Sequence, residues 1–141
     1  MTYVDTSAAV PLFVPEPASE RVEAWFAACD EPLVSSDWMV TEFGSALAIK
    51  TRTGALSTRD ANAVWRSFED FCRSGLRLAA VSRLAFLEAA ALARHPAHGL
   101  RAGDALHLAV AREIGARSIA TLDDLMAANA KRIKIKVVSF S

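Results

Sequence analysis

Apolar residues recur along this chain with two spacings, one typical of helices and one typical of strands. Val22, Trp25 and Phe26, for example, lie at helical intervals among charged residues, which predicts an amphipathic helix. Helical spacing, capping residues and terminating glycines predict helices over 8–14, 18–28, Ser36 or Asp37 to about Gly54, Ser57 or Thr58 to Gly75, Ser82 through Leu92, Asp104 to Gly115, and 125–130. Short apolar or alternating runs predict strands over 2–4, 33–35, 76–81, 118–120 and 133–138.

The order of these elements indicates the fold class. Helices separate the successive strands, and this order favours an α/β fold in which a mostly parallel sheet carries helices on both faces. With 141 residues, the chain is expected to form one domain, residues 1–141. Sheets of this kind bind ligands beyond the carboxyl ends of their strands, where the strand order reverses. We therefore expect functional residues at that edge.

Composition and charge exclude several classes of protein. The chain is 52% hydrophobic and 23% charged, which excludes a disordered or collagen-like protein. Lys and Arg together number 16, as do Asp and Glu, so a nucleic-acid partner must be bound by a local basic patch. The opening residues lack the basic region of a signal peptide, and no apolar run approaches the roughly 18 residues of a membrane span. We expect a cytoplasmic protein without membrane contact.

Acidic residues lie at several places near that edge of the predicted sheet. Asp5 ends the first strand, Asp104 opens the helix between the third and fourth strands, and Asp123 and Asp124 follow the fourth strand. Glu42 lies one turn into the helix after the second strand, on a face of apolar and small residues. An inward-facing carboxylate there needs a partner.

Each of these acids also has a structural explanation. Asp5 can cap a short helix, Asp104 can complement a helix dipole, and Asp123 or Asp124 can serve as a turn or cap residue. Acids that only cap helices or complete turns need not lie together at one edge of the sheet, whereas acids that bind one metal ion must do so. Clustered carboxylates repel one another, and a divalent cation removes that conflict. Oxygen ligands favour Mg²⁺ or Mn²⁺, and such an ion supports phosphodiester hydrolysis.

Four segments of the chain resemble the motif blocks of one family. The segments YVDTSAAV, TEFGSAL, RAGDALHLAVA and IATLDD are similar to those of PIN-domain ribonucleases, in particular VapC-type toxins of toxin–antitoxin pairs. The resemblance spans nearly the whole chain. It implies a three-layer α/β/α sandwich with a central parallel sheet, and a metal-dependent endonuclease that cuts RNA. It also implies an antitoxin protein and a homodimer as partners.

The resemblance assigns roles to individual residues. Asp5, Glu42 and Asp104 match the first three acids of the family, and Asp123 matches the fourth through a Thr-x-Asp pattern. After the fourth acid the family often has a basic or neutral residue, whereas this chain has a second acid, Asp124. Asp124 is therefore the alternative candidate for the fourth acid. The expected metal ligands are Asp5, Asp104 and Asp123, while Glu42 either binds metal or takes the proton from the attacking water. The hydroxyls expected to orient the ligands or a bound phosphate belong to Thr6, Ser7 and Thr121.

Other residues allow further hypotheses. A basic rim for RNA is expected from Lys50, Arg52, Arg59, Arg66 and Arg101. His107, one turn after Asp104, is interpreted as a helix-face hydrogen-bonding residue, and the run KRIKIK as a protected edge strand. A noncatalytic PIN-like interaction module remains the alternative function. A phosphoaspartate receiver is disfavoured because the chain lacks the acidic pair that should end its first strand.

Overall fold

A five-stranded parallel sheet forms the centre of the protein, whose computed structural model describes residues 1–141. The strand order is β3-β2-β1-β4-β5, and all neighbouring pairs are parallel. Tyr3 of the central strand lies opposite Val34 on one side and Ile119 on the other. The strands are β1 (Thr2–Val4), β2 (Leu33–Ser36), β3 (Arg77–Ala79), β4 (Ser118–Ala120) and β5 (Lys136–Val137).

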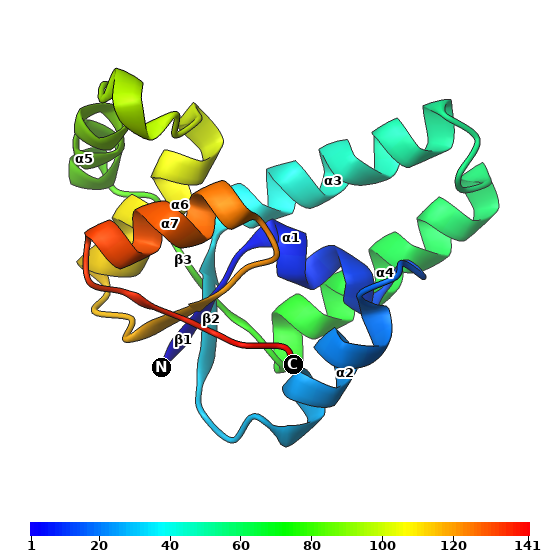
Figure 1. Cartoon of the computed structure of the whole chain (residues 1–141). Coiled ribbons are helices and arrows are strands. Elements are labelled where there is room, and N and C mark those ends of the chain that lie inside the picture. The colour runs from blue at the N-terminus through cyan, green and yellow to red at the C-terminus, as the bar shows by residue number, and fades with distance from the viewer.

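Helices cover both faces of the sheet, as the α/β fold class predicts (Figure 1). One face carries α1 (Thr6–Ala9), α2 (Ser19–Ala28), α3 (Asp37–Arg52) and α4 (Thr58–Ser74), with a 3₁₀ helix at Val10–Leu12. The other face carries α5 (Arg83–Ala93), α6 (Ala102–Glu113) and α7 (Asp124–Arg132), with a 3₁₀ helix at Pro96–His98. In Figure 1, α3 and α4 run side by side and project away from the sheet as a long helical hairpin.

The two faces have separate apolar cores because successive side chains of a strand point in opposite directions. Tyr3 belongs to the core under α5, α6 and α7, whereas the adjacent Val4 belongs to the core under α1 to α4. Ile119 and Ala120 of β4 divide between the two cores in the same way. The molecule is thus a three-layer α/β/α sandwich, as the family resemblance implied.

Several predicted boundaries were wrong. The strand expected over 133–138 is limited to β5, because the chain turns after α7 and Lys134 adopts a left-handed backbone with φ of 65°. The strand expected over 76–81 covers only β3. The helix expected to open at Asp104 begins two residues earlier, so Asp104 is its third residue. No helix combines the length and apolar character that a bilayer crossing requires.

The strand order reverses between β1 and β4. From β1 the chain adds β2 and then β3 on one side, and β4 and then β5 on the other. The segments that leave the carboxyl ends of β1 and β4 therefore separate to opposite sides, which opens a crevice at this position. Asp5 immediately follows β1, and Thr121 and Asp123 follow β4.

Candidate active site

Asp5 is buried at the head of the crevice, with 3% of its surface exposed. It occupies the N-cap position of α1, but its side chain makes no capping hydrogen bond. Instead, one carboxylate oxygen accepts hydrogen bonds from Ser7 Oγ (2.6 Å) and Thr121 Oγ1 (2.8 Å). Capping therefore does not explain Asp5. The two hydroxyls fix the orientation of its carboxylate.

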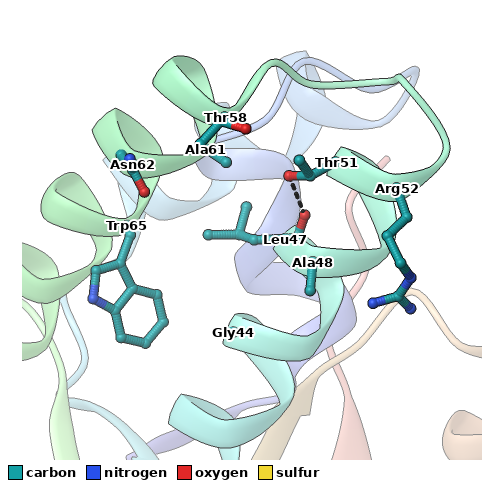
Figure 2. Close-up of a pocket in the computed structure, with 9 residues that line it drawn as sticks. All are labelled: Gly44, Leu47, Ala48, Thr51, Arg52, Thr58, Ala61, Asn62 and Trp65. Carbon is teal, nitrogen blue, oxygen red and sulfur yellow. Dashed lines mark hydrogen bonds between the residues drawn. The ribbon is translucent and has the colours of Figure 1, made fainter.

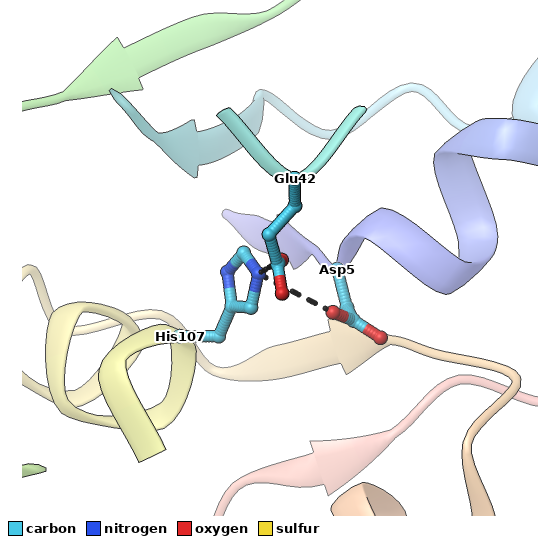
Figure 3. A group of neighbouring side chains, drawn as sticks. All are labelled: Asp5, Glu42 and His107. Carbon is cyan, nitrogen blue, oxygen red and sulfur yellow. Dashed lines mark hydrogen bonds and ion pairs between the residues drawn. The ribbon is translucent and has the colours of Figure 1, made fainter. Parts of the chain in front are cut away.

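Glu42 reaches the same place from the first half of α3. Its Oε1 accepts hydrogen bonds from Thr6 Oγ1 (2.6 Å) and from His107 Nε2. His107 Nε2 also lies 3.6 Å from Asp5 Oδ1, so one ring nitrogen faces both acids (Figure 3). Burial acts to raise the pKa of Glu42, but the hydrogen bonds from His107 and Thr6 hold it below its usual value. These are the partners that an inward-facing glutamate requires.

His107 is completely buried, and both of its ring nitrogens have partners. The Tyr3 hydroxyl donates to Ser36 Oγ (2.9 Å) and lies 2.7 Å from His107 Nδ1. Because the Tyr3 proton is directed at Ser36, the Tyr3 oxygen is left to face Nδ1, while Nε2 faces Glu42. Burial alone acts to lower the pKa of His107, but the bond to Glu42 and the charge of Asp5 raise it above its usual value.

Asp104 and Asp123 are joined by one arginine. Arg101 Nε lies 3.3 Å from Asp104 Oδ2, and its Nη2 lies 3.2 Å from Asp123 Oδ2. Burial and the negative charge of Asp5 raise the pKa of Asp104 above its usual value, although Arg101 acts to lower it. The negative charge of Asp5 therefore repels the ionised carboxylate of Asp104. Asp123 also caps α7, because its Oδ1 accepts from Met126 N at 2.8 Å.

A family model of the PIN domain matches residues 2–132 of the chain. The chain belongs to the PIN-domain family. Ribonuclease VapC45 of Mycobacterium tuberculosis (strain CDC 1551 / Oshkosh) is 35% identical to this PIN domain over 115 residues, which cover 82% of the chain and 77% of the relative. Ribonuclease VapC49 of strain ATCC 25618 / H37Rv has the same identity and coverage.

The fold of this PIN domain is similar to that of several solved structures. The sarcin–ricin loop cleaving toxin VapC20 of Mycobacterium tuberculosis superposes with a TM-score of 0.70 at 22% identity, covering 91% of this chain and 95% of the other. FitAcB from Neisseria gonorrhoeae superposes with a TM-score of 0.67 at 18% identity, covering 99% and 98%. These comparisons confirm the predicted PIN fold and the resemblance to the VapC family.

The residues of this PIN domain suit a divalent cation. Asp5 lies with Glu42 and His107 in a group whose ligand atoms are within 4.8 Å of one another. Asp104 and Asp123 lie outside that group, but burial and then the charge of Asp5 raise the pKa of Asp104. Oxygen donors of this kind are those that Mg²⁺ and Mn²⁺ prefer. Asp124, the alternative fourth acid, is exposed in the first turn of α7 and makes no side-chain hydrogen bond or ion pair. Asp123, by contrast, pairs with Arg101.

Two of the three predicted hydroxyl residues, Ser7 and Thr121, form one network in the PIN domain, while Thr6 bonds to Glu42. Ser7 Oγ, besides its bond to Asp5, lies 3.2 Å from Thr121 Oγ1 and accepts from Leu122 N at 2.9 Å. Asp123 N in turn donates to Thr121 Oγ1 at 3.1 Å. These hydroxyls thus orient carboxylates and also complete turns. Both interpretations of them fit the structure.

Two residues of the site were missed or undervalued by sequence reasoning. His107 was correctly interpreted as a hydrogen-bonding residue, but its contacts with Glu42 and Asp5 were not foreseen. The available signal was its spacing, because residues i and i+3 share one helix face and His107 follows Asp104 at that interval. Arg101 was assigned to an RNA rim, yet it pairs with two of the acids. The i,i+3 spacing could have indicated the pair with Asp104, but no spacing rule predicts the pair with Asp123.

Proposed function

We propose that this PIN domain is a metal-dependent endoribonuclease that hydrolyses RNA phosphodiester bonds as the cytoplasmic toxin of a toxin–antitoxin module. The observation that carries the proposal is the crevice between β1 and β4, where Asp5 and Glu42 share His107 while Asp104 and Asp123 share Arg101. The curated relatives named ribonucleases support the same activity.

The four acids have separate roles in this proposal. Asp5, Asp104 and Asp123 hold Mg²⁺ or Mn²⁺, and Ser7 and Thr121 orient the carboxylate of Asp5. When bound, the cation neutralises phosphate charge and makes water a stronger nucleophile. Glu42 accepts the proton of the attacking water, for which its lowered pKa keeps it ionised.

Water is the nucleophile in this reaction. A covalent route requires a nucleophilic side chain beside a general base. Cys29 and Cys72 are both partly buried and far from the acids in sequence, and burial raises the pKa of the Cys72 thiol, which disfavours its thiolate. Neither cysteine belongs to the group of Asp5, Glu42 and His107 at the crevice.

RNA binding in this proposal relies on local arginines. Arg52, Arg59 and Arg66 are exposed on the hairpin of α3 and α4, and none of them pairs with an acid. Lys50, expected in the same rim, pairs with Glu16 at 2.8 Å. The three unpaired arginines are therefore available for phosphate contacts, which strengthen binding without selecting a sequence.

The antitoxin in this proposal binds the groove between α3 and α4. The groove has a volume of about 480 Å³, and Figure 2 shows Leu47 and Trp65 facing it from the two helices. Arg52 lies at its rim, next to Thr51. An amphipathic helix with apolar anchors and an acidic residue opposite Arg52 has the chemistry that fits such a groove.

A second copy of the chain is proposed to cover α5. Leu84, Phe86 and Leu87 are exposed by 71%, 55% and 61%, and this helix holds most of the large exposed apolar side chains. Leu84 and Leu87 lie three residues apart, on one face of the helix. A contiguous apolar surface of this kind is typical of an interface, and a homodimer would bury it symmetrically.

The decisive experiment for the activity is cleavage of a labelled RNA by the purified protein with Mg²⁺ or Mn²⁺. Asp5→Asn is expected to abolish cleavage, and chelation of the metal to have the same effect, while the circular dichroism spectrum stays unchanged. The matched control is Asp124→Asn, which is expected to cleave like the wild type. Cleavage by Asp5→Asn at the wild-type rate, or none by the wild type, would favour a noncatalytic interaction module.

A further inference from the structure

The buried imidazole of His107 is held at both ends. Its Nε2 donates to Glu42 Oε1, and its Nδ1 lies 2.7 Å from the hydroxyl of Tyr3, which is itself completely buried. Tyr3 is fixed in turn by its 2.9 Å hydrogen bond to Ser36 Oγ. A chain of contacts therefore leads from the end of β2 through β1 and α6 to the carboxylate on α3.

His107 belongs to a group of residue types that commonly bind metals, but both of its ring nitrogens contact other side chains. Ligand atoms of Asp5, Glu42 and His107 lie within 4.8 Å of one another. A histidine that binds a metal, however, must present an unprotonated ring nitrogen. Here Nε2 is directed at Glu42, and Nδ1 is directed at Tyr3, on the side away from the acids. Both nitrogens therefore already have protein partners.

We propose that His107 is a positioning residue, oriented by Tyr3, that holds the Glu42 carboxylate where it can accept the proton of the attacking water. The proposal rests on the ribonuclease function proposed above. It adds that this fully buried pair, and not the acids alone, determines how well the general base works.

Glu42 needs such a restraint because its side chain is long and 26% exposed. Without His107, Oε1 keeps only the hydrogen bond from Thr6 Oγ1 at 2.6 Å. On the other side, Glu42 Oε2 lies against Gly103, which offers no hydrogen-bonding side chain. A general base must lie within about 3.2 Å of the proton that it accepts, and a displacement of about 1 Å can cost about 100-fold in rate.

Three substitutions test the contacts of the two ring nitrogens of His107 separately. His107→Gln keeps an N–H donor near the position of Nε2, whereas His107→Asn keeps one only near Nδ1. Tyr3→Phe removes the hydroxyl that orients the ring and preserves the volume of the side chain. We expect kcat to fall about 100-fold in His107→Asn and about tenfold in His107→Gln and Tyr3→Phe, with KM unchanged. The control is His95→Gln, an exposed histidine outside the site.

A double-mutant cycle tests whether His107 acts through Glu42. The variant carrying both Glu42→Gln and His107→Gln is expected to cleave no more slowly than Glu42→Gln alone, because the second change has no further group to misplace. Multiplied losses would show that His107 acts independently, as a ligand or a base, and would overturn the proposal. Equal rates for His107→Asn and the wild type would do the same.

A cycle at the same two residues is measured without metal or RNA, as urea unfolding of the wild type, Glu42→Ala, His107→Asn and the variant that carries both changes. His107→Asn is expected to lower the unfolding midpoint less in the Glu42→Ala background than in the wild type, since alanine at position 42 offers no acceptor for the hydrogen bond. Equal shifts in both backgrounds contradict the proposal. Because this measurement needs no cleavage, a protein that cuts no RNA but shows the coupling refutes the proposed ribonuclease and leaves the contact established.

Discussion

Gly103 of α6 lies against two polar atoms of α3, Glu42 Oε2 and Trp38 Nε1. A Cβ at Gly103 would lie 3.1 Å from Glu42 Oε2 and 3.2 Å from Trp38 Nε1, which is closer than ordinary van der Waals contact. The indole nitrogen is buried and has no hydrogen-bond partner. Glycine at this position therefore leaves room for the carboxylate, in a helix whose backbone has ordinary right-handed geometry here.

Gly103→Ala is predicted to displace Glu42 by a few tenths of an ångström without removing any of its hydrogen bonds. We expect kcat for RNA cleavage to fall about tenfold, since small displacements of a catalytic group are costly. The unfolding free energy should change by less than about 1 kcal/mol, because alanine suits a helix at least as well as glycine. Steady-state kinetics and urea unfolding of the same preparation measure both. A wild-type kcat would mean that Glu42 tolerates the methyl group.

Asp104→Asn is predicted to stabilise the metal-free protein at neutral pH. The pKa of Asp104 is raised on folding by burial and by the charge of Asp5, so its ionised form is better tolerated in the unfolded chain. This penalty is absent below the unfolded pKa and grows as the pH rises through the folded pKa. The advantage of Asp104→Asn should therefore be present at pH 7 and disappear near pH 3.

Urea unfolding of both proteins across this pH range, in the presence of a chelator, measures the effect. Asp124→Asn is the control, because Asp124 is exposed and unpaired. Mg²⁺ should reverse the order by stabilising the wild type more than Asp104→Asn. A loss of stability in Asp104→Asn at pH 7 would mean that the ion pair with Arg101 outweighs the repulsion.

Individual residues differ in how far the sequence reveals them. Asp5 and Glu42 could be proposed because one ends a strand and the other faces an apolar helix surface. His107 could not be paired with Glu42, because the contact joins residues 65 positions apart and depends on how α3 and α6 pack. Arg101 is a similar case, since its link to Asp123 spans 22 positions. Local spacing carries no information about such contacts.

At the scale of elements, periodicity predicts long helices better than short strands. The helices α3 and α4 were foreseen almost to the residue, since each carries several turns of apolar spacing and a stop signal. The β5 strand was predicted too long, because Ile133 and Ile135 alternate with lysines although the first of them ends α7 in a turn. The alternation there comes from a helix end and a short edge strand in succession.

The α5 helix carries the prediction about assembly. The double substitution of Leu84→Glu and Leu87→Glu is expected to convert the proposed homodimer to a monomer, because it places charge in the apolar surface that the second copy covers. Sedimentation velocity measures the change. The unfolding free energy of the monomer should stay within about 0.5 kcal/mol of the wild type, since both leucines are exposed in the monomer. A wild-type protein that sediments as a monomer contradicts the proposed dimer.

At the scale of the whole molecule, the zero net charge limits how RNA is attracted. Only Arg52, Arg59 and Arg66 are both exposed and unpaired on the hairpin of α3 and α4. With three phosphate contacts, the slope of log affinity against log salt concentration should be about −2 for single-stranded RNA. Fluorescence anisotropy with the inactive Asp5→Asn variant measures this slope. Arg66→Ala should reduce its magnitude by about 0.7, and an unchanged slope would place the RNA elsewhere.

The position of β1 at the centre of the sheet determines when the sheet can form during synthesis. Thr2 of β1 pairs with Ser118 of β4, so β1 receives one of its two neighbours only after 116 further residues have been synthesised. Such distant pairings form late, because a long loop must close first. Thr121 and Asp123 arrive with the same strand. The residues on the two sides of the crevice can therefore come together only after β4 has been synthesised.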